Sequence, residues 1–395
     1  MTVTSLRDEV QSLAADAIAL RRELHMHPEL GFHEFNTSRI VAERLRALGL
    51  EVQTGIAGTG VIGLLRGARP GRCVLLRADM DALPIEEQND VPYRSRVAGV
   101  MHACGHDGHT AGLLTVARLL AERRDQFAGI VKFCFQPCEE NPPGGAKPMI
   151  EAGVLEEPHV DACFGLHIWQ SLPVGTIGVV PGPAMANSDR FRIVVRGRGG
   201  HAAQPHLTVD SVVVASQIVV ALQTVVARNV SPLKPAVVTV GSLHAGTTYN
   251  VIADTAELKG TLRSFDPETR RLLPARVEAV ARAVAESLGA TIDWEFLEGY
   301  PACVNDPAMA TLVREVAGGL IGPENVLQPE PTMGGEDFAY FLQQRPGCFW
   351  FVGSRNEERG LTFGHHHPRF DIDEAALPIA IESLTAVALR YLSEP

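Results

Sequence analysis

The sequence predicts an α/β protein of two domains, and three observations support that prediction. First, 395 residues exceed what one typical core accommodates. Second, hydrophobic segments typical of buried strands alternate with helical segments up to residue 186 and again after residue 300. Third, the order from residue 189 to 297 becomes β-α-β-β-α-β, the split βαβ or ferredoxin-like unit. We therefore expect a larger domain of residues 1–186 and 300–395, interrupted by a smaller domain of residues 187–299.

Hydrophobic periodicity assigns the elements in order. Helices are expected at 5–24, 37–48, 108–123, 209–226, 268–288, 308–320 and 374–392. Strands are expected at 60–66, 72–77, 129–136, 162–169, 190–197, 236–243, 256–263, 291–297 and 348–353. Ser5, Asn36 and Thr208 are the residue types that cap helix N-termini, so we expect them to begin the first, second and fourth helices.

Composition excludes several classes of protein. The net charge of -11 argues against a nucleic-acid partner, which would require a basic surface. We see no apolar run long enough to span a bilayer and no secretory signal, so we expect no membrane partner. Seven scattered cysteines, an odd number, fit reduced thiols better than a disulfide framework. These features favour a cytoplasmic location.

The stretch M-H-A-C-G-H-D-G-H-T, residues 101–110, concentrates three histidines, a cysteine and an aspartate. Cys104 and His106 are two residues apart, so both can point into one cavity of an extended or turning backbone. Thiolate and imidazole suit Zn²⁺ or a similar transition ion better than Mg²⁺ or Ca²⁺. The alternative is a tight turn before a helix, with Cys104 as a small buried hydrophobe.

Polar residues also follow three expected strands. They are Asp79 and Asp81, then Glu139 and Glu140, and then His167 near its strand end. Ligands of open α/β sheets bind at this edge, so we expect one site there, completed by one of the histidines at 365–367. Taken singly, an adjacent glutamate pair is more often a solvated turn, and a histidine triplet is more often part of a polar loop.

The candidate ligands outnumber the four that one tetrahedral ion binds. They are Cys104, His106, Glu140 (or Glu139), His167 and a C-terminal histidine. Two ions that share a bridging ligand would use them all. One glutamate of the adjacent pair can then bind metal, while the other accepts a proton from water.

Several motifs resemble the metallopeptidase M20 family, in particular its amidohydrolase branch of hippurate hydrolases, N-acyl-amino-acid amidohydrolases and auxin-conjugate hydrolases. The resemblance covers nearly the whole chain, in order. It rests on these motifs: R-A-D-M-D-A-L-P (77–84), M-H-A-C-G-H-D-G-H-T-A (101–111), Q-P-C-E-E-N-P-P-G-G-A (136–146), F-G-L-H (164–167), G-R-G-G-H-A-A-Q-P-H (197–206), G-T-L-R-S-F (260–265) and M-G-G-E-D-F (333–338).

The resemblance implies a mixed-sheet, zinc-peptidase-like catalytic domain interrupted by a lid domain that also forms the dimer. It implies hydrolysis of N-acyl amino acids to a carboxylic acid and a free amino acid, with two divalent ions per subunit. Mn²⁺ or Zn²⁺ are the first expectation, and Co²⁺ or Ni²⁺ are also used in the family. A homodimer or homotetramer is expected.

The same resemblance assigns roles to individual residues. The metal ligands would be Cys104 (bridging), His106, Glu140, His167 and His366. Glu139 would be the general base for metal-activated water, and Asp81 would orient a metal ligand. His201 would stabilise the oxyanion, and Asn250 and Arg263 would hold the substrate carboxylate. Taken alone, His201 is equally a turn residue, and Arg263 is more often a surface charge.

Two departures and three rivals remain open. The run at 365–367 leaves the register of the metal-binding histidine uncertain, and Cys138 stands where the family usually has alanine. The rival functions are a dipeptidase or other M20-type aminoacylase, a non-catalytic metal-dependent binding protein, and a redox sensor built on Cys104.

Overall fold

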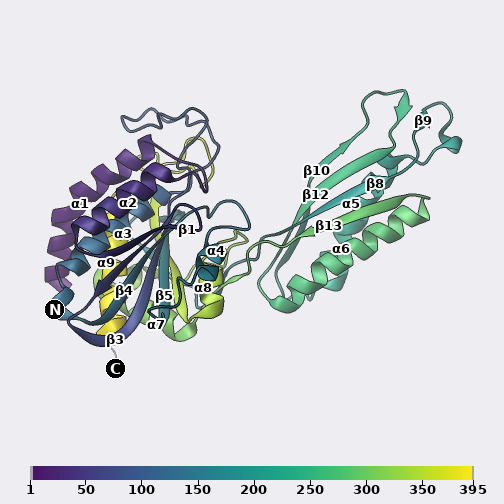
Figure 1. Ribbon diagram of the computed structural model, residues 1–395. Coiled ribbons are helices and arrows are strands. Elements are labelled where there is room, and N and C mark those ends of the chain that lie inside the picture. Colours follow the sequence, from purple (N-terminus) through teal and green to yellow (C-terminus); the bar gives the residue numbers. More distant parts are fainter. Residues whose placement is uncertain (1–2, 394–395) are drawn as a thin grey trace. The chain divides into compact units, whose positions relative to one another are not determined.

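The computed structural model describes residues 3–393 and divides into two compact units (Figure 1). Unit 1 comprises Met1–Ala184, Cys303–Glu330 and Asp337–Pro395. Unit 2 comprises Met185–Ala302 and Pro331–Glu336. Unit 2 is therefore inserted between two segments of unit 1, and it takes a further short segment from the C-terminal third of the chain.

An eight-stranded mixed sheet forms the centre of unit 1, in the order β1-β2-β4-β3-β5-β16-β6-β15. The pairs β4–β3, β3–β5 and β5–β16 are parallel, so these four strands direct their carboxyl ends to the same edge. The strands are β1 (Glu51–Ile56), β2 (Gly60–Arg66), β3 (Arg69–Asp79), β4 (Ala128–Gln136), β5 (Ala162–Pro173), β6 (Ile177–Gly178), β15 (Val326–Leu327) and β16 (Gly347–Arg355).

Helices cover this sheet and enclose its core. Helices α3 and α9 pack directly on the parallel strands, and α1 packs on both of them. Strands β3, β4 and β5 contribute fully buried apolar residues such as Leu76, Phe133 and Phe164. The helices are α1 (Val3–Met26), α2 (Phe35–Ala47), α3 (His106–Ala121), α4 (Ala146–Glu151), α7 (Pro307–Ile321), α8 (Ala339–Gln344) and α9 (Ala376–Ser393).

Unit 2 has a four-stranded antiparallel sheet in the order β10-β12-β8-β13, with α5 and α6 packed on it. Its elements follow the chain as β8 (Asp189–Arg196), α5 (Ser211–Asn229), β10 (Ala236–Ala245), β12 (Thr255–Ser264), α6 (Pro267–Ser287) and β13 (Thr291–Leu297). This is the β-α-β-β-α-β order expected from the sequence. Short strands β9 (Gly200–His201) and β11 (Val251–Ile252) form a separate pair in unit 2. Strands β7 (Gly182–Met185) and β14 (Cys303–Asn305) form another pair, which lies almost entirely in unit 1.

The three helix-cap predictions are wrong. Ser5 lies inside α1, and Asn36 lies inside α2. The carboxylate of Glu29 accepts hydrogen bonds from the amides that begin α2, so a distant side chain does the work expected of Asn36. Asp210 rather than Thr208 caps α5 and accepts two backbone N–H bonds. In α2 a tertiary contact overrides the local signal.

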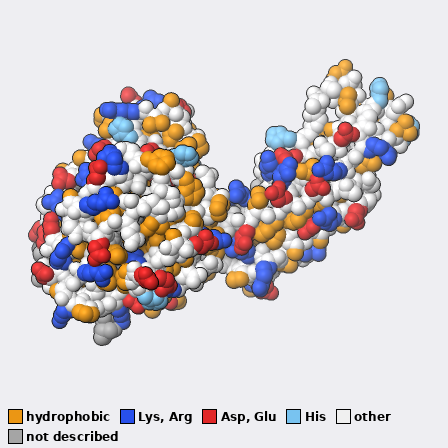
Figure 2. Space-filling model, viewed as in Figure 1, with side chains coloured by type: hydrophobic (Ala, Val, Ile, Leu, Met, Phe, Trp, Pro, Cys, Tyr) orange, Lys and Arg blue, Asp and Glu red, His pale blue; other side chains and the backbone are white. Residues whose placement is uncertain are grey.

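The expectation that no apolar segment reaches membrane-spanning length is also wrong. By length and composition, α5 and α9 could both span a membrane. Of their apolar 18-residue stretches, 33% is buried in α5 and 67% in α9. Each packs on the sheet of its own unit, and core helices commonly have such a composition. Figure 2 shows acidic and basic side chains interspersed on the visible face of both units.

Candidate metal centre

The candidate centre lies in unit 1 at the carboxyl ends of the parallel strands. Asp79 ends β3 beside Gln136, the last residue of β4. His167 lies in β5, which is the neighbour of β3 on its other side. Helix α3 begins at His106, directly after Gly105, whose φ of 91° is a left-handed conformation that glycine adopts without strain. Strand ends and one helix start therefore meet, as the sequence predicts.

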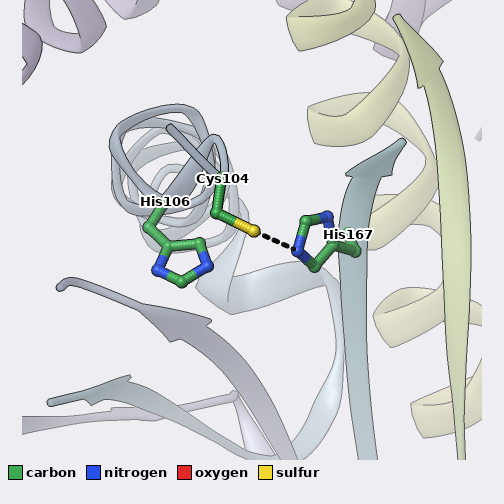
Figure 3. Close-up of side chains that lie close together, drawn as sticks. All are labelled: Cys104, His106 and His167. Carbon is green, nitrogen blue, oxygen red and sulfur yellow. Dashed lines mark hydrogen bonds between the residues drawn. The ribbon is translucent and has the colours of Figure 1, made fainter. Parts of the chain in front are cut away.

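Cys104 and His167 face each other across this edge (Figure 3), with Sγ and Nε2 3.4 Å apart. His167 Nδ1 lies 2.7 Å from the carbonyl of Ile168, so this nitrogen carries the proton and Nε2 presents its lone pair. Burial, followed by the nearby His109 and His365, holds the pKa of His167 well below its usual range. Burial also raises the pKa of the Cys104 thiol. A bound cation would favour its thiolate.

His106 is oriented by Asp81. Its Nδ1 lies 2.9 Å from the Asp81 carbonyl and 3.2 Å from Oδ1 of the same residue. Its Nε2 is buried and has no hydrogen-bond partner among the described residues. Burial opposes the imidazolium, yet the nearby carboxylates of Asp79 and Asp81 raise the pKa of His106 to about 10. The same carboxylates would also favour a metal cation bound at this imidazole.

Glu140 joins two parts of the chain. Its backbone N–H donates to Oδ2 of Asp81 at 3.0 Å, and its Oε1 lies 3.2 Å from Nε2 of His366. The backbone N–H of His366 donates to the carbonyl of Ala103, which ties the C-terminal loop to the Cys104 segment. Ligand atoms of Cys104, Glu140 and His366 all lie within 4.8 Å of one another.

The other two C-terminal histidines have different partners. His365 Nε2 accepts the backbone N–H of Gln170 at 3.2 Å, and burial lowers the pKa of His365 to about 3. His367 stacks on Phe363 and accepts the N–H of Arg369. Of the three, His366 is therefore the one placed beside Glu140 and Cys104.

Glu139 is 7% exposed, and its carboxylate groups with His106 and Glu140 within 4.8 Å. A buried carboxylate next to candidate ligands has the position that a general base requires.

Charged residues that sequence reasoning did not assign support this centre. Arg77, buried in β3, donates to Asp79 at 2.6 Å and to Asp337 at 2.9 Å. Asp79 also lies 2.6 Å from Nδ1 of His109, whose Nε2 accepts the N–H of Ile168. Burial opposes ionisation of Asp79, yet Arg77 and two histidines hold its pKa well below its usual range. Two features of the sequence could have indicated these residues. The A-D-M-D motif contains Asp79, and the spacing of His106 and His109 places both on one face of a helix.

His25 belongs to a second buried network behind His106. Its Nδ1 lies 2.8 Å from Asp107, and Arg21 donates to the same carboxylate at 2.7 Å. His25 thus supports the start of α3, whereas Nδ1 of His27, which follows α1, lies 2.9 Å from the carbonyl of Glu23 within that helix.

The remaining predicted residues lie in unit 2. His201, on β9, is exposed and accepts the N–H of Ala203. Asn250 is close to it, because the Ala202 N–H donates to the Asn250 carbonyl. Arg263, on β12, is partly buried and donates from Nε to Thr261 Oγ1 at 3.0 Å. Their roles toward the metal centre stay predictions.

The donor set fits divalent ions. It combines one sulfur, imidazole nitrogens and carboxylate oxygens, and none of the described residues forms a hydrogen bond with the buried Nε2 of His106. In the cell these residues would hold one ion between Cys104, His106 and His167 and another between Cys104, Glu140 and His366, groups that share the thiol.

Comparison with known proteins identifies the family of this chain. A thermostable carboxypeptidase of Saccharolobus solfataricus is 41% identical over 98% of both chains. The N-acetyl-L-cysteine deacetylase of Bacillus subtilis is 43% identical over 97% of this chain and 90% of its own. The structure of Bacillus subtilis YXEP, described as a dinuclear metal binding peptidase from the M20 family, superposes with a TM-score of 0.83 at 38% identity over 97% and 99% of the two chains. Residues 75–390 match Peptidase family M20/M25/M40, and the chain belongs to that family.

Proposed function

We propose that this protein is a metal-dependent amidohydrolase that cleaves N-acyl amino acids to a carboxylic acid and a free amino acid. The observation that carries the proposal is the meeting of a thiol, imidazoles and carboxylates around the buried Nε2 of His106, with the buried Glu139 beside them. The deacetylase among the relatives supports an acylated amino acid as substrate. Hippurate is the first member of that class to test.

Each residue then has a defined task. When bound, two divalent ions would polarise the amide carbonyl and lower the pKa of a water molecule. Glu139 takes the proton of that water and passes it to the leaving nitrogen. His201 donates to the oxygen on which negative charge develops. Arg263 and Asn250 bind the free carboxylate of the amino acid, for which an arginine offers paired hydrogen bonds.

The test combines metal content with hydrolysis. The purified protein is stripped with chelator, reloaded separately with Mn²⁺ or Zn²⁺, and assayed with hippurate, other N-acyl amino acids and dipeptides. We expect activity only after reloading, and a loss of at least about 100-fold in Glu139→Gln with two ions still bound, because a general base contributes about 10²–10⁴-fold. Glu43→Gln, at an exposed glutamate of the same unit, is the matched control.

The results separate the rivals. Hydrolysis by the metal-free protein contradicts the proposal, and so does full activity in Glu139→Gln. A fully loaded protein that cleaves only dipeptides moves the assignment to a dipeptidase, and one that cleaves nothing moves it to a binding role.

We further propose a cytoplasmic protein that pairs with a second copy through unit 2. All seven cysteines are free, which supports a reducing compartment. Strand β10 lies at the edge of its sheet, and α5 exposes Val212, Val213 and Val220, of which Val220 is 66% exposed. Unpaired strand edges and exposed apolar helix faces are common in interfaces between copies. Light scattering should give a molar mass twice that of the chain, and Val220→Glu should shift this mass toward that of a single chain.

A further inference from the structure

The segment between α1 and α2 contacts the turn that follows β3 and contains Asp81. The carbonyl of Glu29 accepts the N–H of Ala82 at 2.8 Å, and Leu30 forms a bridge with the same residue. Ala82 directly follows Asp81, the residue that orients His106. Because the Glu29 carboxylate also binds the amides that begin α2, the segment is fixed to a helix while it contacts the turn.

Glu34, in the same segment, contacts the turn that follows β4 and contains Cys138. It is fully buried, its Oε1 accepts the N–H of Cys138 at 2.8 Å, and its Oε2 accepts the hydroxyl of Thr59. Cys138 immediately precedes Glu139 and Glu140. Its own carbonyl accepts the N–H of Gly145 at 2.9 Å, so both of its peptide groups are held.

Cys138 is held in a conformation that its side chain disfavours. Its φ is +49°, in the left-handed region that non-glycine residues rarely adopt. Such backbone persists only where surrounding contacts determine it, and it gathers at functional sites. Two hydrogen bonds are contacts of that kind: the Cys138 N–H donates to the buried Glu34, and the Gly145 N–H donates to the Cys138 carbonyl.

We propose that Glu34 is a positioning residue of the metal centre, which holds the Cys138 amide and thereby sets the direction in which Glu139 and Glu140 leave the end of β4. The turnover part of this inference rests on the proposed function, and the metal-binding part does not.

Gly31 shows how closely the segment approaches the turn. A Cβ at this position would lie 2.6 Å from Sγ and 2.9 Å from Cβ of Cys138. Real Cβ atoms do not approach that closely, so Gly31→Ala should push the turn away from its bonded position.

The test uses Glu34→Ala, Glu34→Gln and the control Thr59→Val. Stripped protein is titrated with Mn²⁺ by calorimetry, and kcat and KM are measured after reloading. We expect Glu34→Ala to weaken one of the Mn²⁺ affinities and to lower kcat, each at least tenfold, with KM within threefold. Glu34→Gln should stay within threefold, because its amide oxygen accepts from Cys138 and its NH₂ donates to Thr59. Thr59→Val, which leaves the Cys138 bond intact, should do the same.

Two results overturn the proposal. One is Mn²⁺ affinity and kcat within threefold of the wild type in Glu34→Ala. The other is Glu34→Gln as impaired as Glu34→Ala, which assigns the effect to charge rather than to position. A wild type that binds Mn²⁺ but hydrolyses nothing contradicts the proposed function alone, since the affinities still test Glu34.

If Glu34→Ala does not fold, a compensating pair carries the test. Gly31→Ala should show the same loss of affinity and kcat. Adding Cys138→Gly removes the obstructing atoms and suits the positive φ, so the double variant should recover at least threefold. An unimpaired Gly31→Ala, or a double variant without recovery, overturns the proposal.

Discussion

Asp81 joins two candidate ligands through one carboxylate, and replacing it tests whether that geometry sets the metal affinity. Its Oδ1 lies 3.2 Å from His106 Nδ1, and its Oδ2 accepts the Glu140 N–H at 3.0 Å. Asp81→Ala removes both carboxylate acceptors and keeps the backbone carbonyl, which lies 2.9 Å from His106 Nδ1. Asp81→Asn retains one, because an amide offers a single acceptor oxygen and its NH₂ then faces a donor.

The expected losses follow from these two bonds. Groups that orient metal ligands contribute about 10–100-fold to affinity or activity. We therefore expect Mn²⁺ affinity to fall about 100-fold in Asp81→Ala and about tenfold in Asp81→Asn, which correspond to about 2.7 and 1.4 kcal/mol. Calorimetric titration of stripped protein measures both, with the exposed Asp90→Asn as control. An Asp81→Ala variant that binds Mn²⁺ within threefold of the wild type would refute the reasoning.

Three further predictions concern other parts of the chain. Burial lowers the pKa of His102 to about 4. Its neutral form therefore contributes stability above pH 6.5, and about 3 kcal/mol of this is lost as the pH falls from 6.5 toward 4. In urea unfolding of the metal-free protein, the unfolding free energy of His102→Gln should therefore depend less steeply on pH than that of the wild type. Arg263→Ala should raise KM for N-acyl amino acids at least tenfold and leave KM for the corresponding amino-acid amides unchanged; equal effects on both would contradict a carboxylate contact. Asp210→Ala removes the two N-cap bonds of α5 and should cost about 1 kcal/mol of unfolding free energy in urea unfolding; an unchanged unfolding free energy would contradict the role of this cap.

The candidate ligands could be predicted because their signals are local. Cys104 and His106 share one short stretch. Glu140 follows the hydrophobic strand β4 and His167 lies in the hydrophobic strand β5, and the carboxyl ends of these strands must meet at one edge of a parallel sheet. The register of the C-terminal histidine could not be predicted this way. It depends on the Ala103 carbonyl, which holds the backbone of His366, and on the Gln170 amide, which occupies His365. Both contacts join residues nearly two hundred positions apart or more.

The residues that hold the ligands in place escaped prediction for the same reason. Glu34 and Glu29 look like ordinary loop acids, since nothing in P-E-L-G-F-H-E indicates that one carboxylate caps α2 and the other binds the amide of Cys138, 104 positions away. Arg77 looks like the end of a buried strand, although it is paired with Asp79 and Asp337. A metal centre needs donors, which residue type reveals, and it needs fixed directions, which only tertiary contacts supply. Buried carboxylates that lie far in the sequence from the strand ends they contact, such as Glu34, are therefore the positions where mutation should separate metal binding from folding.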